Sequence, residues 1–201
     1  IGYADYLSLA QAAEAGPGAA DTLFFPGCSL VSYAPEVVRA VADWLAASGV
    51  RLALSDGCCG SPLMSAGMFD RAEALRYGFI EQMQAAGITR MVTICPGCGE
   101  EFADDMPEGI EIVPLPGLLR ECAAKRRAAG MEPGFAPLRR ESLTFFDSCH
   151  DRFDSAHAQS IRALMRTYLP EAKQCEIEHR KQGTLCCGAG GAVASYDADI
   201  T

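Results

Sequence analysis

Short apolar runs alternate along this chain with longer segments in which apolar residues recur at helical spacing. The runs with strand character lie near 22–25, 50–55, 90–94 and 110–114, and the helical patterns cover 34–48, 68–86, 99–106 and 115–129. Three of the four helical patterns stop at a glycine, as helices commonly do. Such alternation is typical of βαβ units, so we predict an α/β fold in which helices cover a parallel sheet.

The order of elements begins again in the last third of the chain. The segment LTFFDSC (143–149) matches TLFFPGC (22–28), and TLCCGAG (184–190) matches DGCCGSP (56–62). A helical pattern and a short strand pattern lie between the two matching segments of the second copy, as in the first. We therefore predict two pseudo-repeated parallel-sheet units, each with flanking helices.

The repeat also defines the expected domain boundaries. We expect a frayed lead-in at 1–21, a first unit at 22–130, a linker at 131–142 and a truncated second unit at 143–201. The second unit stops before any counterpart of CPGC (95–98), which by the spacing of the first unit would fall beyond Thr201. Because the first residue is Ile1, we expect the chain to be a piece of a longer protein.

Composition and charge exclude several classes of function. Of the 201 residues, 49% are hydrophobic and 21% charged, as in globular proteins. No apolar run approaches the ~20 residues of a membrane-spanning helix, so we expect no membrane span. The net charge of −9 argues against nucleic-acid binding, which needs clustered lysine and arginine.

Ten cysteines are an unusual number for a chain of this kind. A disulfide-stabilised secreted scaffold would be shorter and richer in loops, and the start of the chain does not have the pattern of a signal peptide. These features together favour metal or redox chemistry in a reducing compartment, and we expect a cytoplasmic protein.

Five of the cysteines follow three different strand patterns directly, with the spacing C-x29-C-C-x35-C-P-G-C; they are Cys28, Cys58, Cys59, Cys95 and Cys98. Because ligands bind beyond the carboxyl ends of parallel strands, these thiols are expected to meet at one end of the sheet. Clustered thiolates suit zinc or iron–sulfur clusters. Adjacent cysteines fit one zinc tetrahedron poorly and can reach two irons of one cluster, so we favour iron–sulfur. Zinc binding and a purely structural group of buried thiols remain as alternatives.

The second unit carries a smaller candidate metal site made of Cys149, Cys186 and Cys187. This set is incomplete, so an empty relic open to oxidation is an alternative interpretation. We interpret Cys122 and Cys175 as structural residues of a helix and a strand. His150 is interpreted as a solvated histidine at a strand end, with a hydrogen bond to a nearby cluster as the alternative.

The segments FFPGC, GCCG and CPGC, with DSCH and CCGAGG after them, resemble the cysteine-rich CCG domain family over about residues 22–201. That family includes the B-type subunit of heterodisulfide reductase, the iron–sulfur subunits of glycolate and lactate oxidation and of anaerobic glycerol-3-phosphate dehydrogenase, and some succinate or thiol:fumarate reductases. The resemblance implies a [4Fe-4S] cluster, of the noncubane type, at the first five cysteines. It also implies that Cys149, Cys186 and Cys187 are ligands of a second cluster, if the missing C-terminal CxxC exists.

The resemblance implies an iron–sulfur electron-transfer component of a heterodisulfide-reductase-like oxidoreductase. Its partners would be flavin or ferredoxin-type iron–sulfur subunits or domains, and its substrate a disulfide or a quinone. The alternatives are a non-catalytic electron-relay module of a dehydrogenase or quinone-linked complex, and a zinc-binding structural domain.

Overall fold

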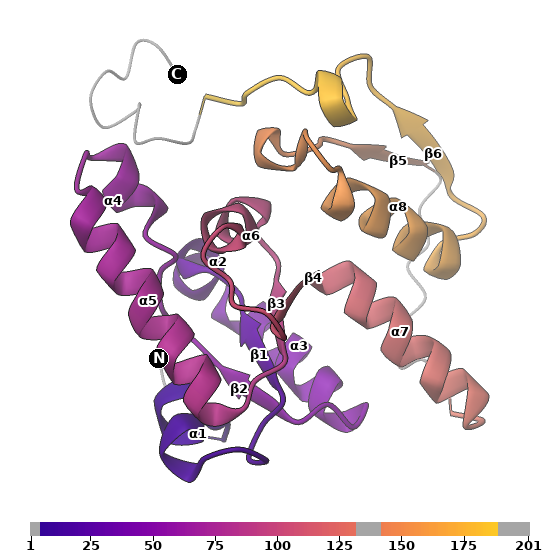
Figure 1. The fold of residues 1–201 in the computed structure, drawn as a ribbon. Helices are drawn as coiled ribbons and strands as arrows, with labels where there is room; N and C mark the ends of the chain where they lie inside the picture. Colours follow the sequence, from indigo (N-terminus) through magenta and orange to yellow (C-terminus); the bar gives the residue numbers. More distant parts are fainter. Residues whose placement is uncertain (1–4, 132–141, 189–201) are drawn as a thin grey trace.

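The computed structural model describes residues 5–131 and 142–188, and it contains two parallel β-sheets (Figure 1). The larger sheet has four strands in the order β2-β1-β3-β4, and the smaller one pairs β5 with β6. All the strand pairs in both sheets are parallel. The predicted α/β class with two parallel-sheet units is therefore confirmed.

The first unit follows the expected alternation of strands and helices. Its elements are α1 (Leu9–Ala15), β1 (Thr22–Phe25), α2 (Cys28–Tyr33), α3 (Pro35–Ala47), β2 (Leu52–Leu54), α4 (Ser61–Ser65), α5 (Phe69–Ala86), β3 (Arg90–Thr93), α6 (Pro96–Ala103), β4 (Glu111–Pro114) and α7 (Leu115–Ala128). The second unit repeats the start of this order. Its elements are β5 (Ser142–Phe145), the 3-10 helix η1 (Cys149–Asp151), α8 (Ala156–Tyr168), β6 (Lys173–Glu176) and the 3-10 helix η2 (Lys181–Gly183).

Both faces of the four-stranded sheet are covered by helices, which explains why its strands are continuous apolar runs. Figure 1 shows α1 and α5 on one side of the sheet and α3 and α7 on the other. Successive side chains of β1 alternate between these layers: Phe25 packs with α5 and α6, and Phe24 packs with α3 and α7. Both phenylalanine side chains are fully buried, so β1 lies at the centre of the core.

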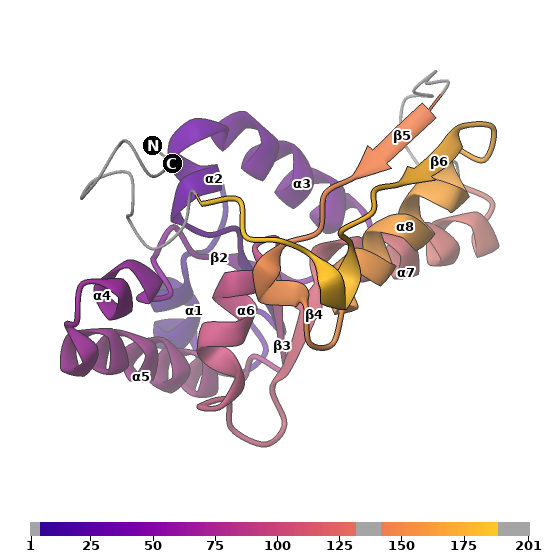
Figure 2. The same ribbon diagram turned by 90° about the horizontal axis from the view of Figure 1, so that it is seen from above.

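The second unit packs against the first through α8 and η1. Helix α8 packs along α7, and η1 contacts α6 (Figure 2). The contact between η1 and α6 brings Cys149 and its neighbours to the end of the larger sheet.

The expectation of a frayed lead-in is wrong for residues 8–15. Ser8 caps α1 reciprocally with Gln11, and the Leu9 and Ala12 side chains are buried against α5 and the sheet. The sequence pattern does not reveal α1, because a helix of seven residues offers only two apolar contacts and their partners lie far along the chain. The expected linker at 131–142 lies almost entirely outside the described residues.

Two short helices, α2 and α4, and an early start of α6 differ from the sequence-based expectation. Pro62 and Pro96 stand at the starts of α4 and α6, where proline is already in the helical φ range and its missing N–H is not needed. Cys98 therefore lies in the first turn of α6 and not in a loop. Within residues 5–131 and 142–188, no helix is both long and apolar enough to span a bilayer.

Candidate metal centre

The first five cysteines lie beyond the carboxyl ends of three neighbouring strands. Strands β2, β1 and β3 are adjacent in the sheet, and each is followed by one part of the set. Cys28 opens α2 after β1, the Cys58–Cys59 pair follows β2, and Cys95 and Cys98 lie at the start of α6 after β3. Parallel register places these three exits at the same edge of the sheet.

The thiols of this set touch one another in two groups. Cys98 is hydrogen-bonded to both Cys59 and Cys95, and Cys58 is hydrogen-bonded to Cys28. Cysteines of both groups line one cavity of about 680 Å³, which we call the thiol cavity; they are Cys28, Cys59, Cys95 and Cys98. This volume lies within the ~300–1,000 Å³ range that is typical of ligand and cofactor sites.

Hydrogen bonds within the set favour thiolates at two positions. A hydrogen bond with Cys98, together with the backbone N–H groups of Cys98 and Gly97, lowers the pKa of Cys95 to about 5. The hydrogen bond with Cys98 also lowers the pKa of Cys59 to about 7. Conversely, hydrogen bonds with Cys59 and Cys95 raise the pKa of Cys98, which stays the protonated thiol of the three. Because the thiolate is the metal-binding form, Cys59 and Cys95 are prepared for ligation near neutral pH.

Gly27 lets the β1 exit approach the α6 cysteines closely. Its φ of +83° is a conformation that side chains disfavour, and a Cβ there would lie 3.2 Å from the Cys98 sulfur. Any larger residue would therefore push into the space between Cys28 and Cys98. The glycine before the first cysteine is thus required by both backbone conformation and space.

The second set of cysteines is also brought together. Cys149 opens η1 after β5, and Cys186 and Cys187 follow β6 and η2. Cys149 is hydrogen-bonded to Cys186, with Cys187 close enough to interact electrostatically. Burial and the neighbouring Cys186 raise the pKa of Cys149. Cys186 and Cys187 are exposed and Cys149 is half-buried, so this set lies nearer the surface than Cys59 and Cys98.

His150 joins the second unit to the first cysteine set. Its Nδ1 lies 2.5 Å from a carboxylate oxygen of Glu100 on α6, and its ring covers Gly97, where a Cβ would lie 3.3 Å away. The ring lines the thiol cavity as well as a smaller cavity of about 260 Å³ between α6, β4 and η1. His150 is half-exposed, as a solvated histidine would be, but it is not isolated. Its partner lies 50 residues away in the other unit, so no local pattern marks the contact.

The two cysteines that we interpreted as structural lie apart from both sets. Cys122 is buried in α7 and packs in the core layer with α3, and burial raises its pKa. Cys175 is half-buried in β6.

The donors of the first set are thiols, which suit iron–sulfur clusters or zinc. Within the described residues, no group of three or more histidine, cysteine or carboxylate side chains has the geometry to hold a metal ion. An iron–sulfur cluster distributes its thiolates over several irons, and it is stabilised by N–H groups near its sulfurs. Backbone N–H groups of Gly60, Ser61, Gly97 and Cys98 already point at the cysteine sulfurs. The residues present therefore fit such a cluster.

Comparison with known proteins agrees with this arrangement. The family model of the cysteine-rich domain called CCG matches residues 22–103 and 143–201, one segment for each unit. The chain belongs to this cysteine-rich domain family. No solved structure matches the chain significantly.

The curated relatives are iron–sulfur proteins and reductase subunits. An uncharacterized iron–sulfur protein of Methanocaldococcus jannaschii is 30% identical over 198 residues, which cover 96% of this chain and 37% of that protein. A subunit of the fumarate reductase (CoM/CoB) of Methanothermobacter marburgensis is 32% identical over 184 residues, covering 88% of this chain and 34% of that subunit. A subunit of the dihydromethanophenazine:CoB–CoM heterodisulfide reductase of Methanosarcina barkeri is 24% identical over 193 residues, 90% of this chain and 46% of that subunit. The chain thus spans about a third to a half of the length of these relatives.

Proposed function

We propose that this chain holds an iron–sulfur cluster at Cys28, Cys58, Cys59, Cys95 and Cys98 and transfers electrons in a heterodisulfide-reductase-like oxidoreductase. The observation that carries the proposal is that four thiols from three neighbouring strand ends line one cavity, with the fifth, Cys58, hydrogen-bonded to Cys28. The relatives support it, because their names describe an iron–sulfur protein, a CoM/CoB fumarate reductase and a heterodisulfide reductase. We propose a [4Fe-4S] cluster of the noncubane type, following the family resemblance.

The chain's own residues would hold and tune such a group. When bound, an iron–sulfur cluster supplies one-electron transfer. Cys59 and Cys95 offer thiolates near neutral pH, and the N–H groups of Ser61, Gly97 and Cys98 stabilise negative charge on sulfur. The phenylalanines beneath, Phe25 and Phe102, are fully buried and keep water away from the sheet side of the site. Water exclusion and N–H donors are the means by which a protein sets a cluster's potential.

We propose that Cys149, Cys186 and Cys187 belong to a second ligand set. Three thiolates are fewer than the four ligands of a [4Fe-4S] cluster, so a second cluster would need a further ligand. The two sets lie at adjoining ends of the two units, because η1 packs on α6. A disulfide bound between them would be within reach of both, and the name of the heterodisulfide reductase relative supports that substrate class.

The partners would be flavin or ferredoxin-type iron–sulfur subunits that deliver electrons. A quinone is the alternative acceptor. Free thiols and an oxygen-sensitive cofactor are compatible with a cytoplasmic location.

The second candidate function is electron relay without catalysis, in a dehydrogenase or a quinone-linked complex. The open cavity beside Cys28 and His150 favours catalysis, since a relay cluster would be better insulated. A zinc-binding structural domain is the third candidate, and the thiol chemistry alone permits it.

The deciding measurement is metal analysis of protein purified under strictly anaerobic conditions. We expect iron and acid-labile sulfide in equal amounts, together with an EPR signal from a reduced or oxidised cluster. Zinc without acid-labile sulfide would contradict the proposal and indicate a zinc-binding structural domain. Addition of a heterodisulfide to the reduced cluster then separates catalysis from relay, because only a catalytic site reoxidises with release of thiols.

A further inference from the structure

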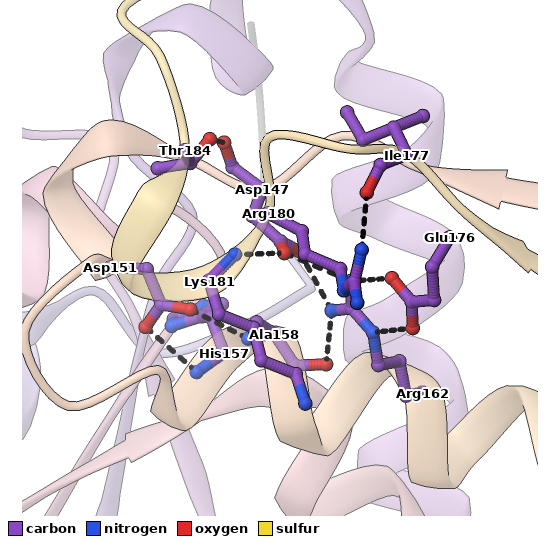
Figure 3. A network of polar contacts seen from close by, with 10 residues as sticks. All are labelled: Asp147, Asp151, His157, Ala158, Arg162, Glu176, Ile177, Arg180, Lys181 and Thr184. Carbon is purple, nitrogen blue, oxygen red and sulfur yellow. Dashed lines mark hydrogen bonds and ion pairs between the residues drawn. The ribbon is translucent and has the colours of Figure 1, made fainter.

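Asp147 is a buried hub in the second unit, as Figure 3 shows. It lies two residues before Cys149, and its side chain is 4% exposed. Its carboxylate accepts hydrogen bonds from Arg162 of α8, at 2.7 and 2.9 Å, and from the backbone N–H of Lys181, at 2.8 Å. Its carbonyl oxygen accepts a hydrogen bond from the Thr184 hydroxyl at 2.7 Å. Asp147, which follows β5, is thus hydrogen-bonded both to α8 and to the segment after β6.

The bonds to Lys181 and Thr184 hold the chain just before the Cys186–Cys187 pair. Thr184 is 4% exposed, whereas Leu185 is 55% exposed and the two cysteines after it are also exposed. Apolar packing therefore does little to fix this segment, and the bonds to Asp147 set where it leaves the protein. The same residue is joined covalently, through Ser148, to Cys149. Asp147 is therefore linked to both cysteines of the contact, to Cys149 through the backbone and to Cys186 through the hydrogen bonds that hold the preceding segment.

Arg162 neutralises the charge of the Asp147 carboxylate, and among the described residues none of its hydrogen bonds goes to the segment 181–186. It donates to Glu176 of β6 at 2.6 and 2.7 Å, and its guanidinium lies 4.8 Å from the centre of the Phe145 ring. Its two carboxylate partners, Asp147 and Glu176, thus differ in what else they bind. Both neutralise Arg162, but only Asp147 holds the segment that leads to Cys186.

We propose that Asp147 is the positioning residue that places the thiol of Cys186 beside that of Cys149. This inference concerns the thiols themselves and stands whether the second set binds iron, zinc or no metal. It goes beyond the proposed function, since a metal-free chain would assemble the same pair. Local hydrogen bonds are sufficient for this task because the span from Lys181 to Cys186 is short.

The test measures thiol proximity in the full chain after chelation of metal. Dibromobimane becomes fluorescent when it bridges two nearby thiols, and peptide mass spectrometry locates each bridge. We expect the bridge between Cys149 and Cys186 to fall about fivefold in Asp147→Asn, since about one net hydrogen bond is lost. The bridge between Cys59 and Cys98 is the internal reference and should not change.

Glu176→Gln is the matched control. It also leaves Arg162 with one carboxylate, but it does not touch the segment 181–184. We expect a similar loss of thermal stability in both variants and an unchanged Cys149–Cys186 bridge in Glu176→Gln. Equal loss of the bridge in both would overturn the proposal and make the network a general stabiliser.

The Thr184 variants decide the matter if Asp147→Asn does not fold. Thr184→Val has almost the same shape and removes only the hydrogen bond to the Asp147 carbonyl. We expect it to reduce the bridge, and Thr184→Ser, which keeps the hydroxyl, to restore it. A full bridge yield in folded Thr184→Val would show that the bond to Asp147 does not position Cys186 and would overturn the proposal.

Discussion

Gly27 and Cys98 approach so closely that a methyl group on Gly27 would lie 3.2 Å from the Cys98 sulfur. The two residues come from different strand exits, so this contact sets how near the first cysteine comes to the α6 pair. A single methyl group added at Gly27 should therefore displace the Cys98 sulfur.

We expect Gly27→Ala to lower the iron content of anaerobically purified protein by at least half. The added methyl group strains a backbone conformation (φ +83°, ψ 152°) that essentially only glycine adopts, which costs about 1–3 kcal/mol, and pushes on the Cys98 sulfur. Gly49→Ala is the matched control, because Gly49 has the same φ of +83° and nothing within 4 Å of its Cβ position. Both variants should lose stability, measured by thermal unfolding, but only Gly27→Ala should lose iron. Equal iron loss in both would mean that backbone strain and not crowding of Cys98 is responsible.

Cys59→Ala should lose the iron–sulfur signal, whereas Cys122→Ala should keep it. Cys59 is hydrogen-bonded to Cys98 and lines the thiol cavity, but Cys122 is buried in α7 within the opposite core layer. The measurement is iron and sulfide per chain, with absorbance of the cluster as a second readout. A comparable loss from both variants would show that the assignment of ligands is mistaken.

Alkylation of the metal-free protein should reveal the lowered pKa of Cys95. The thiolate is the reactive form, and the pKa of Cys95 is lowered to about 5 by its hydrogen bond with Cys98 and by backbone N–H groups. We expect iodoacetamide to modify Cys95 already at about pH 6, with little further gain above about pH 7. Cys122, whose pKa is raised by burial, should react only in alkaline solution or after unfolding. A Cys95 rate that keeps rising up to about pH 9 would contradict the lowered pKa.

Arg162→Ala should destabilise the second unit by about 3–5 kcal/mol, because it leaves two carboxylates without their buried partner. The side chains of Arg162 and Asp147 are 5% and 4% exposed, so water does not replace the bonds to Asp147, whereas Glu176 is 32% exposed and stays partly hydrated. Lys125→Ala breaks the exposed ion pair with Glu121, where the lysine is 70% exposed, and should cost no more than about 0.5 kcal/mol. Urea unfolding, monitored by circular dichroism, measures both. A loss in Arg162→Ala as small as that in Lys125→Ala would mean that the network contributes little.

The amino-acid sequence alone was sufficient to predict the parallel sheet and the first cysteine set. Short apolar runs such as TLFF, alternating with helical patterns, are typical of a parallel sheet covered by helices, and their ends place Cys28, Cys59 and Cys95 at one edge. The repeat of the FF and CC segments likewise predicted a second unit, which the family match confirms. These features are local in sequence, or follow from strand order, so they need no knowledge of long-range contacts.

The way the two units meet, and the bonds that hold the second thiol pair, became visible only in the folded chain. The bond between His150 and Glu100 joins residues 50 positions apart, and the bond between Asp147 and Thr184 joins residues 37 positions apart. The burial of α1 against α5 is another such contact. In each case the residues involved are ordinary in their local sequence, and their roles arise from partners that folding brings near. Hydrogen bonds and packing depend on distance in space, which a linear pattern does not encode.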